Sequence, residues 1–63
     1  MNLENYFDCL VKITLNDGRH IRAFVSDYMS PDENADGRGS IVLEEPDMEI
    51  FEDEIAKIEI LEI

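Results

Sequence analysis

The sequence predicts an all-β domain folded as a small five-stranded barrel, and three observations support this prediction. Several short segments alternate apolar and polar residues with a period of two, which is typical of strands with one buried face. Turn-forming residues separate these segments at short intervals, as they do in small antiparallel barrels. The chain of 63 residues is long enough for one domain, residues 1–63, with a thin core. Barrel closure would also remove the exposed strand edges that invite aggregation.

The first predicted elements are a helical turn and a hairpin. Residues 2–7 are expected to form one short helical turn with Leu3, Tyr6 and Phe7 as its apolar face. Residues 11–15 and 19–26 alternate as strands, and the Asn-Asp-Gly sequence between them supplies a tight hairpin turn. The strand side chains expected to face the core are Val11, Ile13, Leu15, Ile21, Ala23 and Val25.

The second half of the chain predicts a loop and three further strands. Residues 29–39 are polar and contain proline and two glycines, so we expect a loop there. The remaining strands are expected at residues 40–43, 48–51 and 55–63, with turns at 44–47 and 52–54. The last strand is apolar on both faces, with Ile58 and Ile60 on the face toward the barrel. The opposite face, with Leu61 and Ile63, is expected to pack against the N-terminal segment or to form the edge of a homo-oligomer.

The net charge of the chain restricts the kinds of molecule that it can bind. Sixteen acidic residues against five basic ones give a net charge of -11, which opposes direct binding to nucleic acid or to an anionic membrane. Residues 1–31 carry about -1 and residues 32–63 about -10. No apolar run exceeds three residues, so neither a membrane span nor a signal peptide is expected, and a single cysteine favours the reducing cytoplasm.

A dense acidic stretch is the main candidate for a binding surface. Residues 44–54 contain seven acids, interspersed with apolar residues that anchor the stretch to the fold. Such a surface can imitate a phosphate backbone and attract a basic protein, although a coating that only confers solubility has the same composition. The predicted partner-binding residues are Asp27, Glu44, Glu45, Asp47, Glu49, Glu52, Asp53 and Glu54.

Other chemistry has weaker signals. Asp32, Asn34 and Asp36, followed by glycine, match the opening of a calcium loop, but leucine stands at position 43, where the bidentate glutamate belongs. A polar turn is the preferred interpretation, and neither a metal nor another cofactor is expected. Cys9 and His20 have no third residue that would complete a catalytic set, so no enzyme is expected. A basic cluster of Lys12, Arg19, His20 and Arg22 beside Phe24 leaves weak RNA binding as an alternative.

The hairpin at residues 11–22 resembles the first hairpin of the Sm-like and SH3-like small barrels. The elements Leu15-x-Asp17-Gly18, Ala23-x-x-Ser26-Asp27 and Phe51-Glu52-Asp53-Glu54-Ile55 resemble the Rho-binding antiterminator family more closely. Members of that family are small acidic bacterial proteins with an Sm-like barrel, and they bind the transcription terminator Rho and block its RNA site.

The resemblance implies a function but not RNA binding. The asparagine and Arg-Gly elements with which Sm proteins contact bases are missing, since the corresponding stretches read Asp27-Tyr28-Met29-Ser30-Pro31 and Asp53-Glu54-Ile55-Ala56-Lys57. The leading prediction is therefore a non-catalytic acidic module that regulates a basic, nucleic-acid-binding protein, as in Rho antitermination. A structural subunit of an Sm-like ring or dimer is the main alternative.

Overall fold

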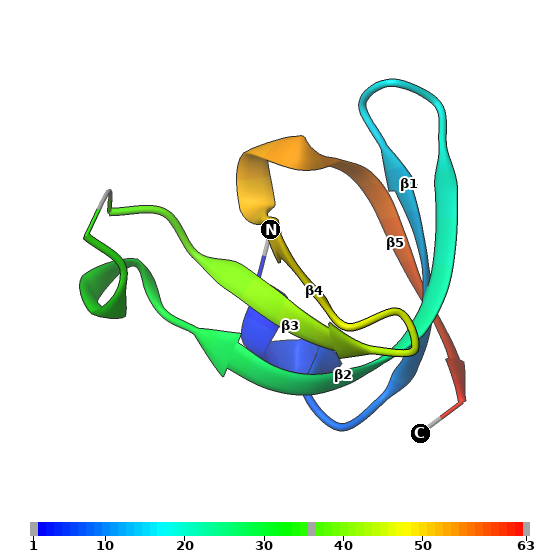
Figure 1. The fold of residues 1–63 in the computed structure, drawn as a ribbon, viewed down its shortest axis with the longest axis horizontal. Coiled ribbons are helices and arrows are strands. Elements are labelled where there is room, and N and C mark those ends of the chain that lie inside the picture. Colours follow the sequence, from blue (N-terminus) through cyan, green and yellow to red (C-terminus); the bar gives the residue numbers. More distant parts are fainter. Residues whose placement is uncertain (1, 36, 63) are drawn as a thin grey trace.

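The computed structural model describes residues 2–35 and 37–62, which form an all-β domain, as the sequence predicted (Figure 1). All five strands belong to one antiparallel sheet, and the helical segments are three short 3₁₀ helices. The strands are β1 (Leu10–Leu15), β2 (His20–Met29), β3 (Ser40–Glu44), β4 (Met48–Phe51) and β5 (Ile55–Glu62). The 3₁₀ helices are η1 (Leu3–Tyr6), η2 (Pro31–Glu33) and η3 (Glu52–Glu54).

The sheet order is β4-β3-β2-β1-β5, so β4 and β5 are its two edges. Figure 1 shows the sheet strongly curved, but in the described residues β4 and β5 are not hydrogen-bonded neighbours. The expected closure into a barrel is therefore not confirmed. The short helix η3 separates the two edge strands, and β5 then pairs along its length with β1, from Leu15 opposite Ile55 to Leu10 opposite Glu62.

The core lies on the concave side of the sheet and follows the predicted period of two. Alternate residues of β1 and β2 are buried as expected, except that Ile21 is only half-buried. The buried apolar side chains are Leu3, Cys9, Val11, Ile13, Leu15, Ala23, Val25, Ile41, Leu43, Ile50 and Ile55. The alternation leaves the other face of each strand for solvent-facing polar residues.

Two predicted details of the first half differ from the structure. The helical turn is present and Leu3 is buried, but Phe7 follows the helix and its side chain is 51% exposed instead of packing on the core. Strand β2 also continues to Met29, beyond the predicted end at residue 26. A register shift between Val25 and Asp27 lets the strand continue, because it keeps Tyr28 opposite Ile41 on the core side.

The end of β5 differs as well. Ile58 packs against the core, whereas Ile60, predicted on the same buried face, is 44% exposed. Leu61 is 45% exposed, so in the described residues it is not covered by the N-terminal segment. Ile60 lies opposite the buried Val11 inside the regular part of the β1–β5 pairing, so its exposure comes from its place on the edge strand β5, which has a neighbouring strand on one side only. Ile63, the second residue of the expected oligomer edge, lies outside the described residues.

Candidate functional site

Strand register brings acidic residues together on the outer face of the sheet. Asp27 on β2 lies opposite Val42 on β3, and Val42 lies opposite Glu49 on β4. Directly opposed residues of antiparallel strands point to the same face, so two carboxylates flank the half-buried Val42. Glu44 is two residues beyond Val42 on β3 and therefore extends the same face.

The turn between β3 and β4 adds two further acids. Glu45 and Asp47 are exposed, and Glu45 has a φ of 53°, in the left-handed region. Met48, 37% exposed, places an apolar side chain next to them. We define the acidic face as Asp27, Glu44, Glu45, Asp47 and Glu49.

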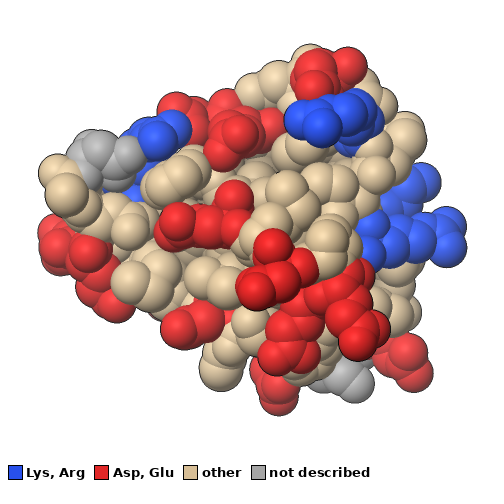
Figure 2. Space-filling view, viewed as in Figure 1, with Lys and Arg blue, Asp and Glu red and all other residues tan. Residues whose placement is uncertain are grey.

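No member of the acidic face forms a salt bridge within residues 2–35 and 37–62. Figure 2 shows Asp and Glu side chains gathered over β3, β4 and the turn between them, while Lys and Arg side chains lie toward the periphery of this view. Unpaired like charges on one face repel each other, and a basic partner would relieve this repulsion.

A partly buried hydrogen-bond network fixes Glu49. The hydroxyl of Ser40, which is completely buried, donates a hydrogen bond of 2.7 Å to Oε2 of Glu49. The side-chain amide of Asn34 donates to the same hydroxyl at 3.2 Å and also to the carbonyl oxygen of Arg38. The β2–β3 loop is thereby attached to the face that carries Glu49.

The three other predicted partner-binding acids lie in η3, at the opposite end of β4 from the β3–β4 turn, and they have internal contacts. Asp53 pairs with Arg38, with 3.0 Å between Oδ1 and Nη1. Glu54 accepts a hydrogen bond of 3.1 Å from the backbone N–H of Phe51, and Glu52 is only half-exposed. The continuous acidic stretch of the sequence is therefore split into two sites.

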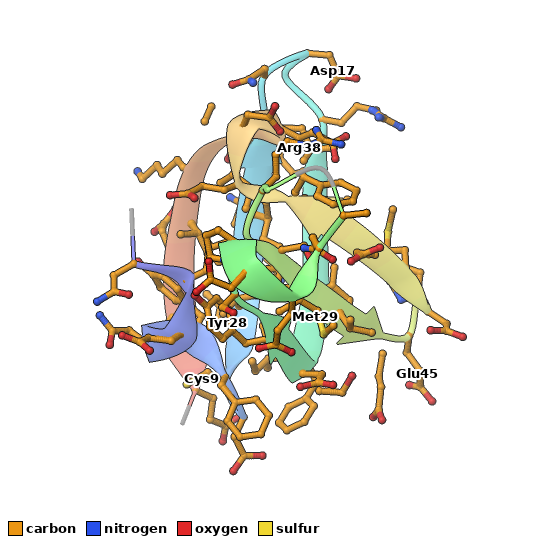
Figure 3. All side chains as sticks on the ribbon, turned by 90° about the vertical axis from the view of Figure 1, so that its left-hand side faces the viewer. Cys9, Asp17, Tyr28, Met29, Arg38 and Glu45 are labelled. Atoms are coloured by element: carbon orange, nitrogen blue, oxygen red, sulfur yellow. The ribbon has the colours of Figure 1, made fainter. Side chains whose placement is uncertain are left out.

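Arg38 is the residue of this region that sequence reasoning missed. Its guanidinium lies 4.0 Å from the centroid of the Phe51 ring, and its Nη1 donates to both oxygens of the Asp53 carboxylate, at 3.0 and 3.2 Å. The only signal in the sequence was that Arg38 is a basic residue among many acidic ones. Figure 3 shows Arg38 below the tip of the β1–β2 hairpin, far from Glu45 at the β3–β4 turn.

A hollow of about 500 Å³ separates this cluster from the hairpin tip, and it carries both charge signs. At the tip, Asp17 accepts hydrogen bonds from the backbone N–H of Arg19 at 3.0 Å and from its Nε at 2.7 Å. The backbone hydrogen bond, followed by the guanidinium, lowers the pKa of Asp17. The residues that line the hollow are Leu15, Asn16, Asp17, Arg19, Arg38, Phe51, Asp53 and Glu54.

The predicted basic cluster is only partly assembled. Lys12 lies opposite Arg22, and Phe24 is two residues farther along the same face of β2. Arg19, however, is occupied by Asp17 at the hairpin tip, and the His20 ring is hydrogen-bonded to the hydroxyl of Thr14 at 3.0 Å.

The described residues that were considered for catalysis and for metal binding do not lie together in a common site. Cys9 is buried, with its Sγ 3.5 Å from the Phe7 carbonyl, at the opposite end of the β1–β2 hairpin from His20. Asn34 uses its amide nitrogen within the loop, Asp32 is exposed in η2, and Asp36 lies outside the described residues. Within the part of the chain that the structure describes, no three His, Cys, Asp or Glu residues are grouped to hold a metal ion.

The helices and the comparisons with known proteins complete the description. In the described residues no helix has the length and apolar character needed to cross a membrane. Comparisons with protein-family models, with curated proteins and with solved structures gave no match. The resemblance of the sequence to the Rho-binding antiterminators therefore stays a prediction.

Proposed function

We propose that the chain is a non-catalytic, cytoplasmic binding module whose acidic face binds a basic, nucleic-acid-binding protein and regulates it. One observation carries the proposal: β-sheet register gathers Asp27, Glu44 and Glu49 on one face around Val42, and Glu45 and Asp47 extend it. None of these five carboxylates has a salt-bridge partner among the described residues. Rho antitermination is the form of this function that the sequence resemblance implies.

The mechanism would be competition by charge. The carboxylates would face lysines and arginines in the partner's nucleic-acid groove, where they would take the place of phosphates. Half-buried Val42 and exposed Met48 would contribute apolar contact at the centre and the rim of the face. Only the five acids defined above belong to this proposal, because Glu52, Asp53 and Glu54 lie in η3, at the other end of β4, and Asp53 is paired with Arg38.

The test measures displacement of a fluorescent single-stranded RNA from a Rho-type terminator by the protein. We expect displacement to weaken steeply between about 0.1 M and about 1 M salt, over which the screening length falls from about 10 Å to about 3 Å. The triple variant Glu44→Gln/Glu45→Gln/Asp47→Asn should displace RNA poorly. A matched control, Asp8→Asn/Asp32→Asn/Glu62→Gln, removes the same charge from exposed residues outside the acidic face. Salt-independent association, or equal losses in both triple variants, would refute the proposal.

A second function is favoured by the exposed end of edge strand β5. Ile60 and Leu61 are both about half-exposed there, and an edge strand offers unpaired backbone groups to a second copy of the chain. A homo-oligomer would bury these residues. Sedimentation equilibrium of the protein and of the variant Leu61→Lys tests this function, and a monomeric mass at high concentration rejects it.

A further inference from the structure

A small hollow beside the N-terminal turn is lined by both aromatic and acidic residues. Its volume is about 220 Å³, and it is lined by Glu4, Phe7, Asp27 and Tyr28. Phe7 is the most exposed of the large apolar side chains in the described residues. The segment that carries it is held against β2, because the backbone N–H of Asp8 donates to the carbonyl oxygen of Val25 at 2.9 Å. Figure 3 shows Tyr28 next to the same turn.

The lining combines two aromatic rings with two carboxylates. Neither Glu4 nor Asp27 has a salt-bridge partner within the described ranges 2–35 and 37–62. The face of an aromatic ring is electronegative and attracts cations, and adjacent carboxylates add a full charge to that attraction. The accessible lining is more apolar than polar, so the hollow suits a group that combines an apolar stem with a cationic, planar head.

Elsewhere in the molecule a cation is held by an aromatic ring and a carboxylate together. Arg38 lies 4.0 Å from the Phe51 ring centroid and is held at 3.0 Å by the Asp53 carboxylate. The hollow at Phe7 has the ring and the carboxylates but no guanidinium among the described residues. A guanidinium is planar, stacks on rings and binds carboxylates in a fork, which a lysine ammonium does not do.

We infer that this hollow receives an arginine side chain of the basic partner protein, stacked on Phe7 and paired with Asp27 or Glu4. The inference rests on the proposed function and deepens it, because Asp27 belongs to the acidic face as well as to the hollow. It identifies where one side chain of the partner docks, at the border of the acidic face.

The experiment uses the isolated protein and three small probes, so that it does not depend on the partner. N-acetyl-arginine methylamide, its lysine counterpart and its citrulline counterpart, which is a neutral planar isostere, are titrated separately and followed by NMR. We expect the arginine probe to shift the ring resonances of Phe7 and Tyr28 and the amide of Asp27. Citrulline should leave these resonances in place, and lysine should bind more weakly. Equal shifts with citrulline, lysine binding as tight as arginine, or no shift with arginine would each overturn the inference.

Two variants test the contributing groups. Phe7→Leu keeps an apolar side chain but removes the ring face, and it should raise the Kd for the arginine probe about two- to fivefold. Asp27→Asn should also raise this Kd, whereas the matched control Asp32→Asn, a loss of the same charge in η2, should not. Phe7 and Asp27 are both exposed, and a thermal melt of each variant verifies folding. Unchanged Kd values in the two variants would overturn the inference.

The two proposals can fail separately. If the probe does not bind at Phe7 but RNA displacement still depends on Glu44, Glu45 and Asp47, the arginine site is wrong and the acidic face stands. If the probe binds at Phe7 but no basic protein is bound by the acidic face, the proposed function is wrong and only the arginine-binding hollow remains.

Discussion

Arg38 stacks on Phe51, with the guanidinium carbon 4.0 Å from the centroid of the ring. The two residues belong to different elements, since Arg38 precedes β3 and Phe51 ends β4, so their contact joins the β2–β3 loop to the far edge of the sheet. Asp53 holds the guanidinium in place at 3.0 Å. Arg38 therefore ties the β2–β3 loop to the end of β4 and to η3.

Replacing Arg38 with alanine should lower the free energy of unfolding by about 0.5–1 kcal/mol, the usual value of an exposed cation–π contact. The ion pair with Asp53 adds little, because both side chains are substantially exposed and screened. Urea denaturation of Arg38→Ala measures the loss. Arg38→Lys should recover only part of the stability, since the ammonium does not stack as the guanidinium does. Full recovery by lysine would show that charge alone acts here.

Ser40 is the second position with a specific expected cost. Its hydroxyl is completely buried between the Glu49 carboxylate and the Asn34 amide, so Ser40→Ala leaves both polar groups short of one partner. We expect a loss of about 1–2 kcal/mol in the free energy of unfolding, measured by urea denaturation. Thr14→Ala removes the exposed hydrogen bond to His20 and should change stability by less than about 0.5 kcal/mol. Similar effects of the two substitutions would contradict the buried network.

The lowered pKa of Asp17 makes a prediction about pH. A carboxyl whose folded pKa lies below its unfolded value stabilises the fold above the unfolded pKa, and this contribution is lost as the pH falls through the folded pKa. The largest cause is the hydrogen bond from the backbone N–H of Arg19, ahead of the guanidinium. An NMR titration of the Asp17 carboxyl should therefore show a low pKa that rises only partly in Arg19→Gln. Complete return to the ordinary value in that variant would assign the lowering to the side chain instead.

The alternating strands could be predicted from the sequence because each carries its own period of two and its own turn residues. Val11 and Ile13 are buried as that pattern requires. The candidate binding surface was harder to predict from the sequence. The acids of residues 44–54 are close together in the sequence, but in the structure they lie at two separate sites. The helix η3 redirects the chain, so that Asp53 turns to Arg38 while Glu49 stays on the sheet face. No local pattern reports such a pairing between a loop and a distant turn.

The exposure of Phe7 could not be predicted from the neighbouring sequence either. A helical period places it beside Leu3 and Tyr6, but η1 ends at Tyr6, and the ψ of 136° at Phe7 takes the chain out of the helix. Because the helix ends one residue before Phe7, the Phe7 ring lies on the surface and not in the core. The hollow that Phe7 forms with Asp27 and Tyr28 depends on this ending and on the position of β2, which only the three-dimensional structure supplies.

Glu45 provides a prediction in which stability and binding change in opposite directions. Its φ of 53° lies in a region that costs an L-residue about 1–2 kcal/mol and that glycine adopts freely. Part of this cost is offset by the extra freedom that glycine gives the unfolded chain, so Glu45→Gly should raise the free energy of unfolding by a few tenths to about 1 kcal/mol. Gly18→Ala, at a φ of 91°, should lower it by about 1 kcal/mol for the converse reason.

The charge of Glu45 has to be separated from its backbone strain, and Glu45→Gln does this because it keeps the side chain and the strain. In urea denaturation, Glu45→Gly should be more stable than both the original protein and Glu45→Gln. The stability of Glu45→Gln should be close to that of the original protein. RNA displacement from the basic partner should instead decline equally in both variants, since both lose the carboxylate. A residue that is strained in the fold and needed only for binding behaves in this way. If Glu45→Gly were less stable than Glu45→Gln, the side chain would be stabilising the turn, and the backbone freedom of glycine would not outweigh that loss.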